Sequence, residues 1–168
     1  IPLAFETDVN AAAWGERKWG AARGLDDFIY ITVGTGIGGG AVSGGKILHG
    51  EGHPEMGHLR IPHDTQMDPF PGSCPFHGDC LEGLASGSAL AKRWNCNPGE
   101  LEETHQGWDL EAHYLADALA NLTLTLCPAR FILGGGVMEQ AHLFDKVRNR
   151  LARRLAGRRV AVAANPPG

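Results

Sequence analysis

The sequence lacks the features that mark several broad classes of protein. No apolar run is long enough to span a bilayer, so we expect no membrane partner. Fifteen Lys and Arg residues stand against nineteen Asp and Glu residues, a net charge of −4, and no basic excess favours a nucleic-acid partner. No secretory leader is visible, and the chain starts at Ile1 rather than Met, so we expect further sequence before it.

Cysteine is also scarce, with four in 168 residues. Two of them belong to a compact run in which Cys74, His77 and Cys80 are spaced C-x2-H-x2-C. Thiolate and imidazole are the ligands that structural zinc prefers, and four of them complete a tetrahedron. A disulfide between Cys74 and Cys80 is the alternative, but it would leave His77 without a purpose. The spacing therefore predicts a zinc site in a protein of the reducing cytoplasm.

The segment upstream of this run, residues 61–73, has three prolines and little apolar periodicity. Such a segment by itself buries too little surface to hold a shape, so we expect a bound metal to order it. His58 is the leading candidate for the fourth ligand, while His53 and His63 are alternatives on spacing alone. The zinc-binding loop would then extend from about residue 58 to residue 82.

Glycine is abundant instead, with 24 residues, and the two clusters at 34–45 and 134–136 each follow an expected strand. A strand is expected at 27–33, because residues 28–33 are apolar or β-branched, and it leads into 34–40, which holds five glycines in seven residues. A Walker A loop is excluded because no Gly-Lys-Ser/Thr follows, and a dinucleotide fingerprint is excluded because a strand follows. The second cluster, Gly134–Gly136, lies between a strand and a helix. Bare N–H groups at both places predict a cleft for a phosphorylated ligand, although a tight hairpin also explains the first cluster.

Strand and helix patterns alternate along the chain, which predicts an α/β fold. Helices are expected at 9–20, 82–94, 110–127 and 140–156, and further strands at 1–5, 41–42, 130–133 and 160–164. Asp109 is the expected N-cap of the third helix, and Pro128 marks its end. Either Thr7 or Asp8 caps the first helix. Alternatively, Asp8 is a general base at a strand-to-helix junction, where α/β folds bind ligands.

In combination, these motifs resemble the fructokinase branch of the ROK family of sugar kinases and repressors, within the actin-like ATPase superfamily. The resemblance covers nearly the whole chain and is carried by Glu6–Asn10 with Gly15–Glu16, Val33–Gly40, His53–His58, Cys74–Gly87 and Gly134–Val137. The zinc loop is its most specific part, and the His-Pro pair at 53–54 is typical of the fructokinase branch. The implied fold is an α/β actin-like ATPase (ribonuclease H-like) domain with an inserted zinc-binding loop.

The resemblance implies ATP-dependent phosphorylation of a hexose, with fructose to fructose 6-phosphate as the leading reaction. It implies structural Zn²⁺, Mg²⁺ bound with ATP, and a homodimer. Asp8 would deprotonate the attacking sugar hydroxyl. The other implied site residues form three groups: the sugar ligands Glu55, His58 and Glu82; the nucleotide-facing Gly34, Thr35, Gly36, Gly135 and Gly136; and the zinc ligands His58, Cys74, His77 and Cys80.

The chain also departs from the family pattern. It contains neither the Asp-x-Gly-x-Thr phosphate loop nor the usual final strand and helix, so residues 1–168 resemble the larger, C-terminal part of a kinase. One alternative is a sugar-sensing repressor domain of the same family, but His77 and the His-Pro pair favour a kinase. The other is a zinc-stabilised module without catalysis, which predicts no cleft beside the metal. The choice between fructose, glucose and mannose depends on geometry that the sequence does not give.

Overall fold

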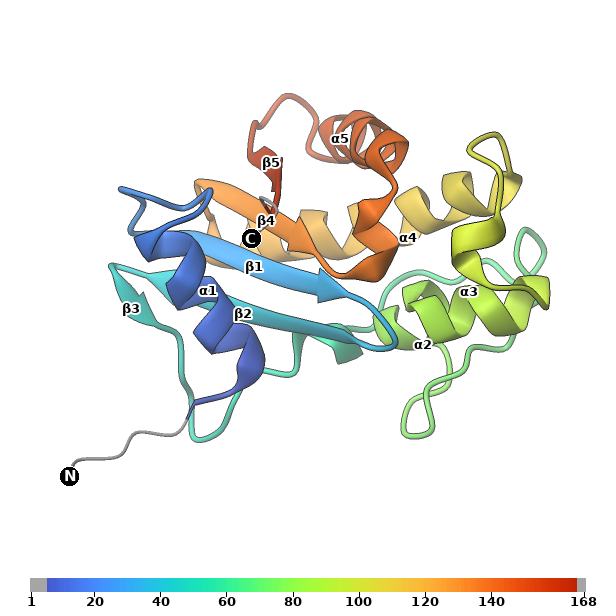
Figure 1. Ribbon diagram of the computed structural model, residues 1–168, viewed down its shortest axis with the longest axis horizontal. Helices are drawn as coiled ribbons and strands as arrows, with labels where there is room; N and C mark the ends of the chain where they lie inside the picture. Colours follow the sequence, from blue (N-terminus) through green and yellow to red (C-terminus); the bar gives the residue numbers. More distant parts are fainter. Residues whose placement is uncertain (1–5, 166–168) are drawn as a thin grey trace.

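The computed structural model describes residues 6–165, which form a mixed five-stranded sheet with helices on both faces (Figure 1). The strand order is β3-β2-β1-β4-β5, with bounds β1 Phe28–Val33, β2 Ile37–Ser43, β3 Lys46–Ile47, β4 Arg130–Gly134 and β5 Ala161–Ala164. β1 pairs antiparallel with β2 and parallel with β4, so Ile31 lies between Gly39 and Leu133. The central position of β1 explains its unbroken apolar sequence, because both of its faces are buried.

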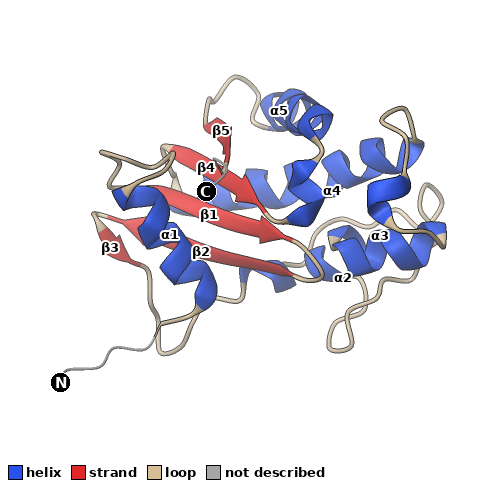
Figure 2. Ribbon diagram, viewed as in Figure 1, coloured by secondary structure: helices blue, strands red, loops and turns tan. Residues whose placement is uncertain are grey.

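The side chains of β1 alternate between two separate cores. Phe28 and Tyr30 face α1 (Asp8–Lys18), whereas Ile29 and Ile31 face a larger core. That larger core includes α4 (Gln106–Leu126) and α5 (Ala141–Arg154), and Figure 2 shows α1 in front of the sheet and α4 behind it. The remaining helical elements are η1 Met56–His58, α2 Leu81–Ala85, α3 Gly87–Trp94, η2 Pro98–Glu100 and η3 Gly136–Glu139.

The first glycine cluster is a short turn followed by a glycine-rich strand, not a seven-residue turn as predicted. Only residues 34–36 form the turn, and Gly38, Gly39 and Gly40 belong to β2. A Cβ on Gly40 would lie 2.6 Å from the carbonyl oxygen of Val9, and one on Gly38 would lie 2.8 Å from the Val9 side chain. These glycines therefore let α1 pack directly on β2, which is a different role from binding an anion.

Two of the expected helix boundaries are wrong. The helix expected at 82–94 breaks at Ser86, where the backbone is extended and the hydroxyl accepts from the N–H of Ala89 to start α3. The long helix starts at Gln106 with His105 as its N-cap, because the His105 ring accepts from the N–H of Gly107 at 3.0 Å. Asp109 lies in the first turn and instead pairs with two basic side chains of α5, those of Lys146 and Arg150.

At the start of α1, Thr7 is the N-cap, since its hydroxyl accepts from the N–H of Asn10. Asp8 is therefore the first helical residue rather than the cap. The strands expected at 130–133 and 160–164 are confirmed as β4 and β5, whereas the one expected at 1–5 lies outside the described residues. Within residues 6–165, no helix combines the length and apolar character needed to cross a bilayer.

Candidate functional site

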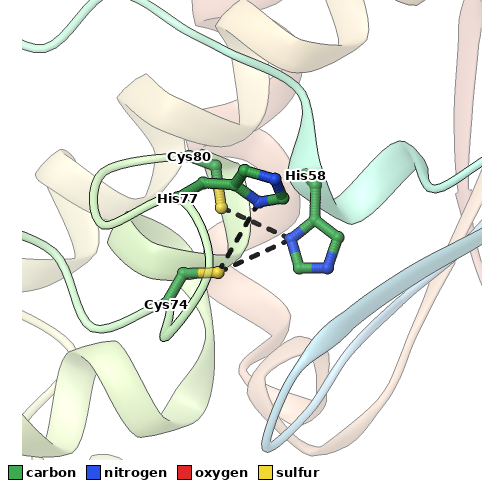
Figure 3. Close-up of side chains that lie close together, drawn as sticks. All are labelled: His58, Cys74, His77 and Cys80. Carbon is green, nitrogen blue, oxygen red and sulfur yellow. Dashed lines mark hydrogen bonds between the residues drawn. The ribbon is translucent and has the colours of Figure 1, made fainter.

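The four expected metal ligands meet at one place. His58, at the end of η1, faces the loop that carries Cys74, His77 and Cys80, and the four ligand atoms all lie within 4.8 Å of one another (Figure 3). Both cysteines of this cluster are free thiols, so the structure does not contain the alternative disulfide. Burial raises the pKa of the Cys80 thiol, which is an environment that favours a neutral thiol unless a cation is bound.

The separations in this cluster fit tetrahedral coordination. Zinc–sulfur bonds of about 2.3 Å and zinc–nitrogen bonds of about 2.0–2.1 Å place tetrahedral donors roughly 3.3–3.8 Å apart. The Nδ1 atom of His58 lies 3.7 Å from Sγ of Cys74 and 3.5 Å from Sγ of Cys80, and Nδ1 of His77 lies 3.9 Å from Sγ of Cys74. Two sulfurs and two imidazole nitrogens at these distances form a donor set that suits Zn²⁺.

Backbone geometry of the loop brings these ligands together. Cys74 and Gly78 exchange both backbone hydrogen bonds, at 3.1 and 3.0 Å, which closes the turn that carries His77. Gly78 has a φ of +64°, which favours glycine. Gly83 in α2 lies so close to this turn that a Cβ would fall 1.8 Å from the carbonyl oxygen of Gly78. Gly78 and Gly83 are therefore needed for the loop to dock on α2.

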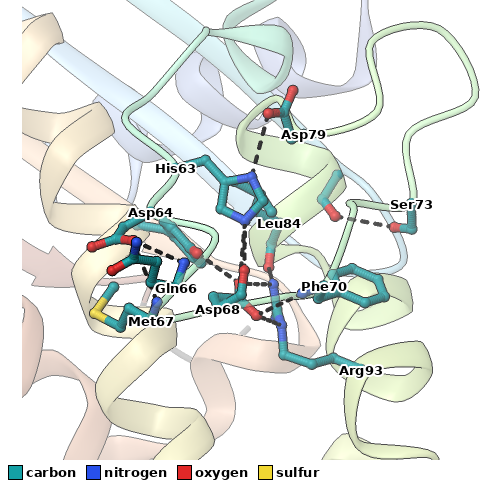
Figure 4. A network of polar contacts seen from close by, with 12 residues as sticks. His63, Asp64, Gln66, Met67, Asp68, Phe70, Ser73, Asp79, Leu84 and Arg93 are labelled. Atoms are coloured by element: carbon teal, nitrogen blue, oxygen red, sulfur yellow. Dashed lines mark hydrogen bonds and ion pairs between the residues drawn. The ribbon is translucent and has the colours of Figure 1, made fainter.

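A second anchor holds the middle of the same loop, and the sequence analysis did not find it. The carboxylate of Asp68 is only 3% exposed and accepts from Nε and Nη2 of Arg93 at 3.2 and 3.0 Å (Figure 4). The hydroxyl of Tyr114 donates to the same carboxylate at 2.6 Å. Ile61, at the loop's start, is also buried in the larger core. Contacts with α3, α4 and the larger core therefore hold this segment, in addition to the metal that the sequence analysis expected to order it.

The alternative fourth ligands have other partners. His63 lies in the second anchor, where its Nε2 is 2.9 Å from the carbonyl oxygen of Asp68 and its Nδ1 is 3.3 Å from Asp79. Burial raises the pKa of Asp79, but the hydrogen bond from His63 and the charge of Arg60 outweigh it and lower that pKa overall. His53 lies beside Asn10, with Nδ1 3.4 Å from the side-chain nitrogen of that residue. Among the candidates, His58 completes the cluster.

A cavity of about 410 Å³ lies beside the cluster, and the carboxylates expected to bind the sugar line it. Asp8, Glu55 and Glu82 all line it, although they come from α1, the start of η1 and α2. The expectation of a bare zinc module, which has no cleft beside its metal, is therefore contradicted. The residues of this cavity that were not expected there are Thr7, Val9, Thr32, Ile37, Gly38 and His53.

Glu82 connects the metal cluster to the glycine turn. One of its carboxylate oxygens accepts from the N–H of Ile37 at 3.0 Å, and the other lies 4.0 Å from Nδ1 of His58. A Cβ on Gly36 would lie 2.6 Å from the Glu82 carboxylate, so only glycine leaves room for it. His58 itself is not among the residues that line the cavity. Its expected second role as a sugar ligand stays a prediction.

A second cavity, of about 550 Å³, meets the first one at the glycine turn. Gly34 and Thr35 line both cavities, whereas Gly36 lines only the first and Gly136 only the second. Gly135 lines neither, because it approaches the backbone of β1 at a φ of +90°. The unexpected residues of the second cavity are Gly87, Ser88, Asn97, Pro98, Gly99, Trp108, Val137, Glu139 and Gln140. Asn97–Gly99 is a turn signal in the sequence, but nothing local shows which cavity it lines.

Comparison with known proteins agrees with this arrangement. The model of the ROK family matches residues 1–165. A protein of Bacillus subtilis (strain 168) that carries fructokinase as a provisional name is 52% identical over 147 residues, covering 88% of this chain and 49% of its own length. The fructokinase of Lactococcus lactis subsp. cremoris is 46% identical over 147 residues, covering 88% of this chain and 50% of its own length. The chain thus spans about half the length of these curated relatives.

A solved structure supports the same assignment. The ROK family glucokinase from Streptomyces griseus, in complex with glucose and AMPPNP, is 31% identical and superposes with a TM-score of 0.77. The match covers 98% of this chain and 64% of the glucokinase. The mixed sheet described above is therefore the actin-like ATPase fold that the motifs predicted. On the match of its sequence and of its fold, the chain belongs to the ROK family.

Proposed function

We propose that this chain is the larger part of an ATP-dependent hexose kinase whose substrate is fructose and whose product is fructose 6-phosphate. One observation carries the proposal: two cavities of unlike lining share Gly34 and Thr35. The first is lined by three carboxylates that suit sugar hydroxyls, and the second is lined by backbone-rich turns that suit a nucleotide. Phosphoryl transfer requires such an arrangement, with acceptor and donor on either side of a phosphate-binding turn.

Asp8 is the proposed general base. Its side chain is exposed to the sugar cavity at the first turn of α1, where one carboxylate oxygen accepts from the N–H of Val9 at 2.8 Å. The other oxygen would take the proton of the attacking hydroxyl as the bond to the γ-phosphorus forms and the bond from that phosphorus to the ADP leaving group breaks. Glu55 and Glu82 accept from other hydroxyls and orient the sugar. ATP bound with Mg²⁺ supplies the phosphoryl group and neutralises charge on its oxygens.

The proposed zinc site has a structural task in this mechanism. It joins η1 to the loop before α2, and Glu55 immediately precedes η1 whereas Glu82 lies in the first turn of α2. A fixed distance between the two carboxylates matters, since a displacement of about 1 Å in a positioning group can reduce the rate by about 10²-fold. Fructose as the substrate rests on the fructokinase names of the relatives and on the His-Pro pair at 53–54.

Substitution of Asp8 by Asn in the full-length enzyme tests the proposal. Asn keeps the size and polarity of the side chain but cannot accept the proton, so we expect kcat for fructose phosphorylation to fall by about 10²–10⁴-fold. Calorimetry should show sugar binding nearly unchanged. Asp26→Asn is the matched control, because Asp26 is an exposed carboxylate that pairs with Arg17 away from the cavity. Near-normal turnover of the Asp8 variant would remove Asp8 from catalysis, and an unaltered enzyme without hexose kinase activity would refute the function.

A further inference from the structure

A hydrogen-bonded chain of side chains leads from the surface to the sugar cavity. Nε2 of His49 lies 3.1 Å from one carboxylate oxygen of Glu6, and the other oxygen of Glu6 accepts from Nδ2 of Asn10 at 2.8 Å. The same Nδ2 lies 3.4 Å from Nδ1 of His53. Asn10 is completely buried, and His53 lines the cavity. The hydrogen-bonded chain therefore joins an exposed histidine, His49, to one that lines the cavity, His53.

The chemistry of these groups fixes which atoms donate. An ionised carboxylate only accepts, so the Asn10 atom that lies against Glu6 must be the amide nitrogen. The opposite orientation would place two acceptor oxygens together, one of them on the buried Asn10 side chain. The hydrogen bond from Asn10 is also the main cause that lowers the pKa of Glu6, which agrees with an ionised carboxylate.

The orientation of Asn10 in turn fixes the tautomer of His53. The amide nitrogen has two protons, and one is used by Glu6. The second points to Nδ1 of His53, which must then be an acceptor. The proton of the neutral ring is therefore on Nε2. Because Nδ1 accepts from Asn10, the Nε2–H group of His53 can donate a hydrogen bond to a ligand.

This donor is unusual in its surroundings. Among the described residues that line the cavity, His53 is the one with a side-chain nitrogen, whereas Asp8, Glu55 and Glu82 offer acceptor oxygens. The hydroxyls of Thr7, Thr32 and Thr35 can either donate or accept. Every hydroxyl of a cyclic hexose can donate to a carboxylate, but the ring oxygen has no proton and can only accept. Carboxylates cannot serve that oxygen, whereas the Nε2–H of His53 can only donate and therefore matches an atom that can only accept.

We infer that His53 is a substrate-binding residue that donates a hydrogen bond from Nε2 to the ring oxygen of the hexose, with its tautomer held by Asn10. The inference rests on the proposed function, because it names how the cavity of that kinase recognises a cyclic sugar. Asn10 is a positioning residue, since it acts only through the histidine ring.

Kinetics of His53→Ala in the full-length enzyme test the contact. We expect the KM for fructose to rise about 10-fold, the ratio that corresponds to one neutral hydrogen bond, with the KM for ATP unchanged. His53→Gln retains an N–H donor near the position of Nε2 and should recover part of the loss. His49→Ala is the matched control, because it removes the histidine at the other end of the same chain, and we expect it to leave the KM unchanged. Equal KM values for fructose in the unaltered enzyme and His53→Ala would overturn the inference.

Two further measurements make the test specific. A carbocyclic fructose analogue has CH₂ in place of the ring oxygen. The unaltered enzyme should bind this analogue about 10-fold more weakly than fructose, whereas His53→Ala should bind the two sugars with equal affinity. An equal ratio in both proteins would contradict the ring-oxygen contact. In the unaltered protein, ¹⁵N NMR of labelled histidines should show the Nε2–H tautomer for His53, and the Nδ1–H tautomer would overturn the argument even if His53→Ala did not fold. Calorimetry of fructose without ATP separates these outcomes from a failure of the kinase proposal.

Discussion

The loop between η1 and α2 is held at two places by different physical means. At its ends, two thiols and two imidazoles converge on a point that suits a metal ion. In its middle, the buried ion pair of Asp68 and Arg93 ties it to α3, and Tyr114 ties it to α4. As a metal site, the first anchor would depend on an ion that can be removed, whereas the second is made of side chains. Among the described residues, the first anchor is the one that lies next to a wall of the 410 Å³ cavity, through Glu82.

This difference predicts that only one of the two anchors affects the cavity as well as the stability of the fold. Loss of the metal anchor should disturb both the loop and the carboxylates of the sugar site. Loss of the ion pair should destabilise the fold but leave the metal ligands in place. Three experiments test the distinction, and the expected effects decrease from the first to the third.

Removal of one metal ligand should have the largest effect. In Cys80→Ser we expect zinc to be lost and the free energy of unfolding to fall. The decrease should be larger than that for breaking a buried ion pair, which costs about 3–5 kcal/mol. Zinc content measured by mass spectrometry and a thermal melt check this. Cys96→Ser is the control, since Cys96 lies outside the cluster and should keep both zinc and melting temperature. A Cys80 variant that melts like the unaltered protein without losing metal would disprove the metal anchor.

Breaking the ion pair should have an intermediate effect. Arg93→Met leaves the Asp68 carboxylate buried without its cationic partner, so we expect the free energy of unfolding to fall by about 3–5 kcal/mol with zinc content unchanged. The double variant Asp68→Leu/Arg93→Met should recover part of the loss, because neither side chain then buries an unpaired charge. Loss of zinc from the single variant would show that the two anchors are one cooperative unit.

The smallest expected effect concerns Glu111, a carboxyl on α4 beside the ion pair. It is fully buried, and within residues 6–165 neither of its oxygens has a hydrogen-bond partner. Burial raises its pKa well above the ordinary value, and the charge of Arg93 only partly opposes this. A raised pKa means that the folded state holds the proton more tightly than the unfolded state. Glu111 therefore contributes stability that is fully present below the ordinary pKa and is lost as pH rises through the folded-state pKa.

Glu111→Gln should remove this dependence on pH. The amide has nearly the same shape and does not ionise, so we expect the variant to gain stability relative to the unaltered protein as pH rises from about 4 to 8. Urea unfolding at several pH values measures the difference. Glu100→Gln, on an exposed 3₁₀-helix, is the matched control. A constant difference across this range would show that Glu111 is already ionised in the fold, paired to Arg93.

Several features of the molecule could be predicted from local sequence. The C-x2-H-x2-C spacing predicted that Cys74, His77 and Cys80 lie together, and the structure brings them together because residues at this spacing share one turn. The apolar run at 28–33 identified the central strand, because a strand with two buried faces needs no polar positions. The glycine turn at 34–36 followed from the position of glycines after that strand.

Other features depended on contacts between distant segments, and only the tertiary structure decided them. Gly38–Gly40 looked like part of a turn, but close packing of α1 places them in β2. His53 and His63 were alternatives to His58 on spacing alone, and in the structure each has another partner far along the chain, Asn10 for His53 and Asp79 for His63. The Asp68–Arg93 pair joins residues 25 positions apart, with no local pattern to mark it. The sequence therefore determined which chemical groups are available, and packing decided which of them meet, because burial and hydrogen bonding act between neighbours in space.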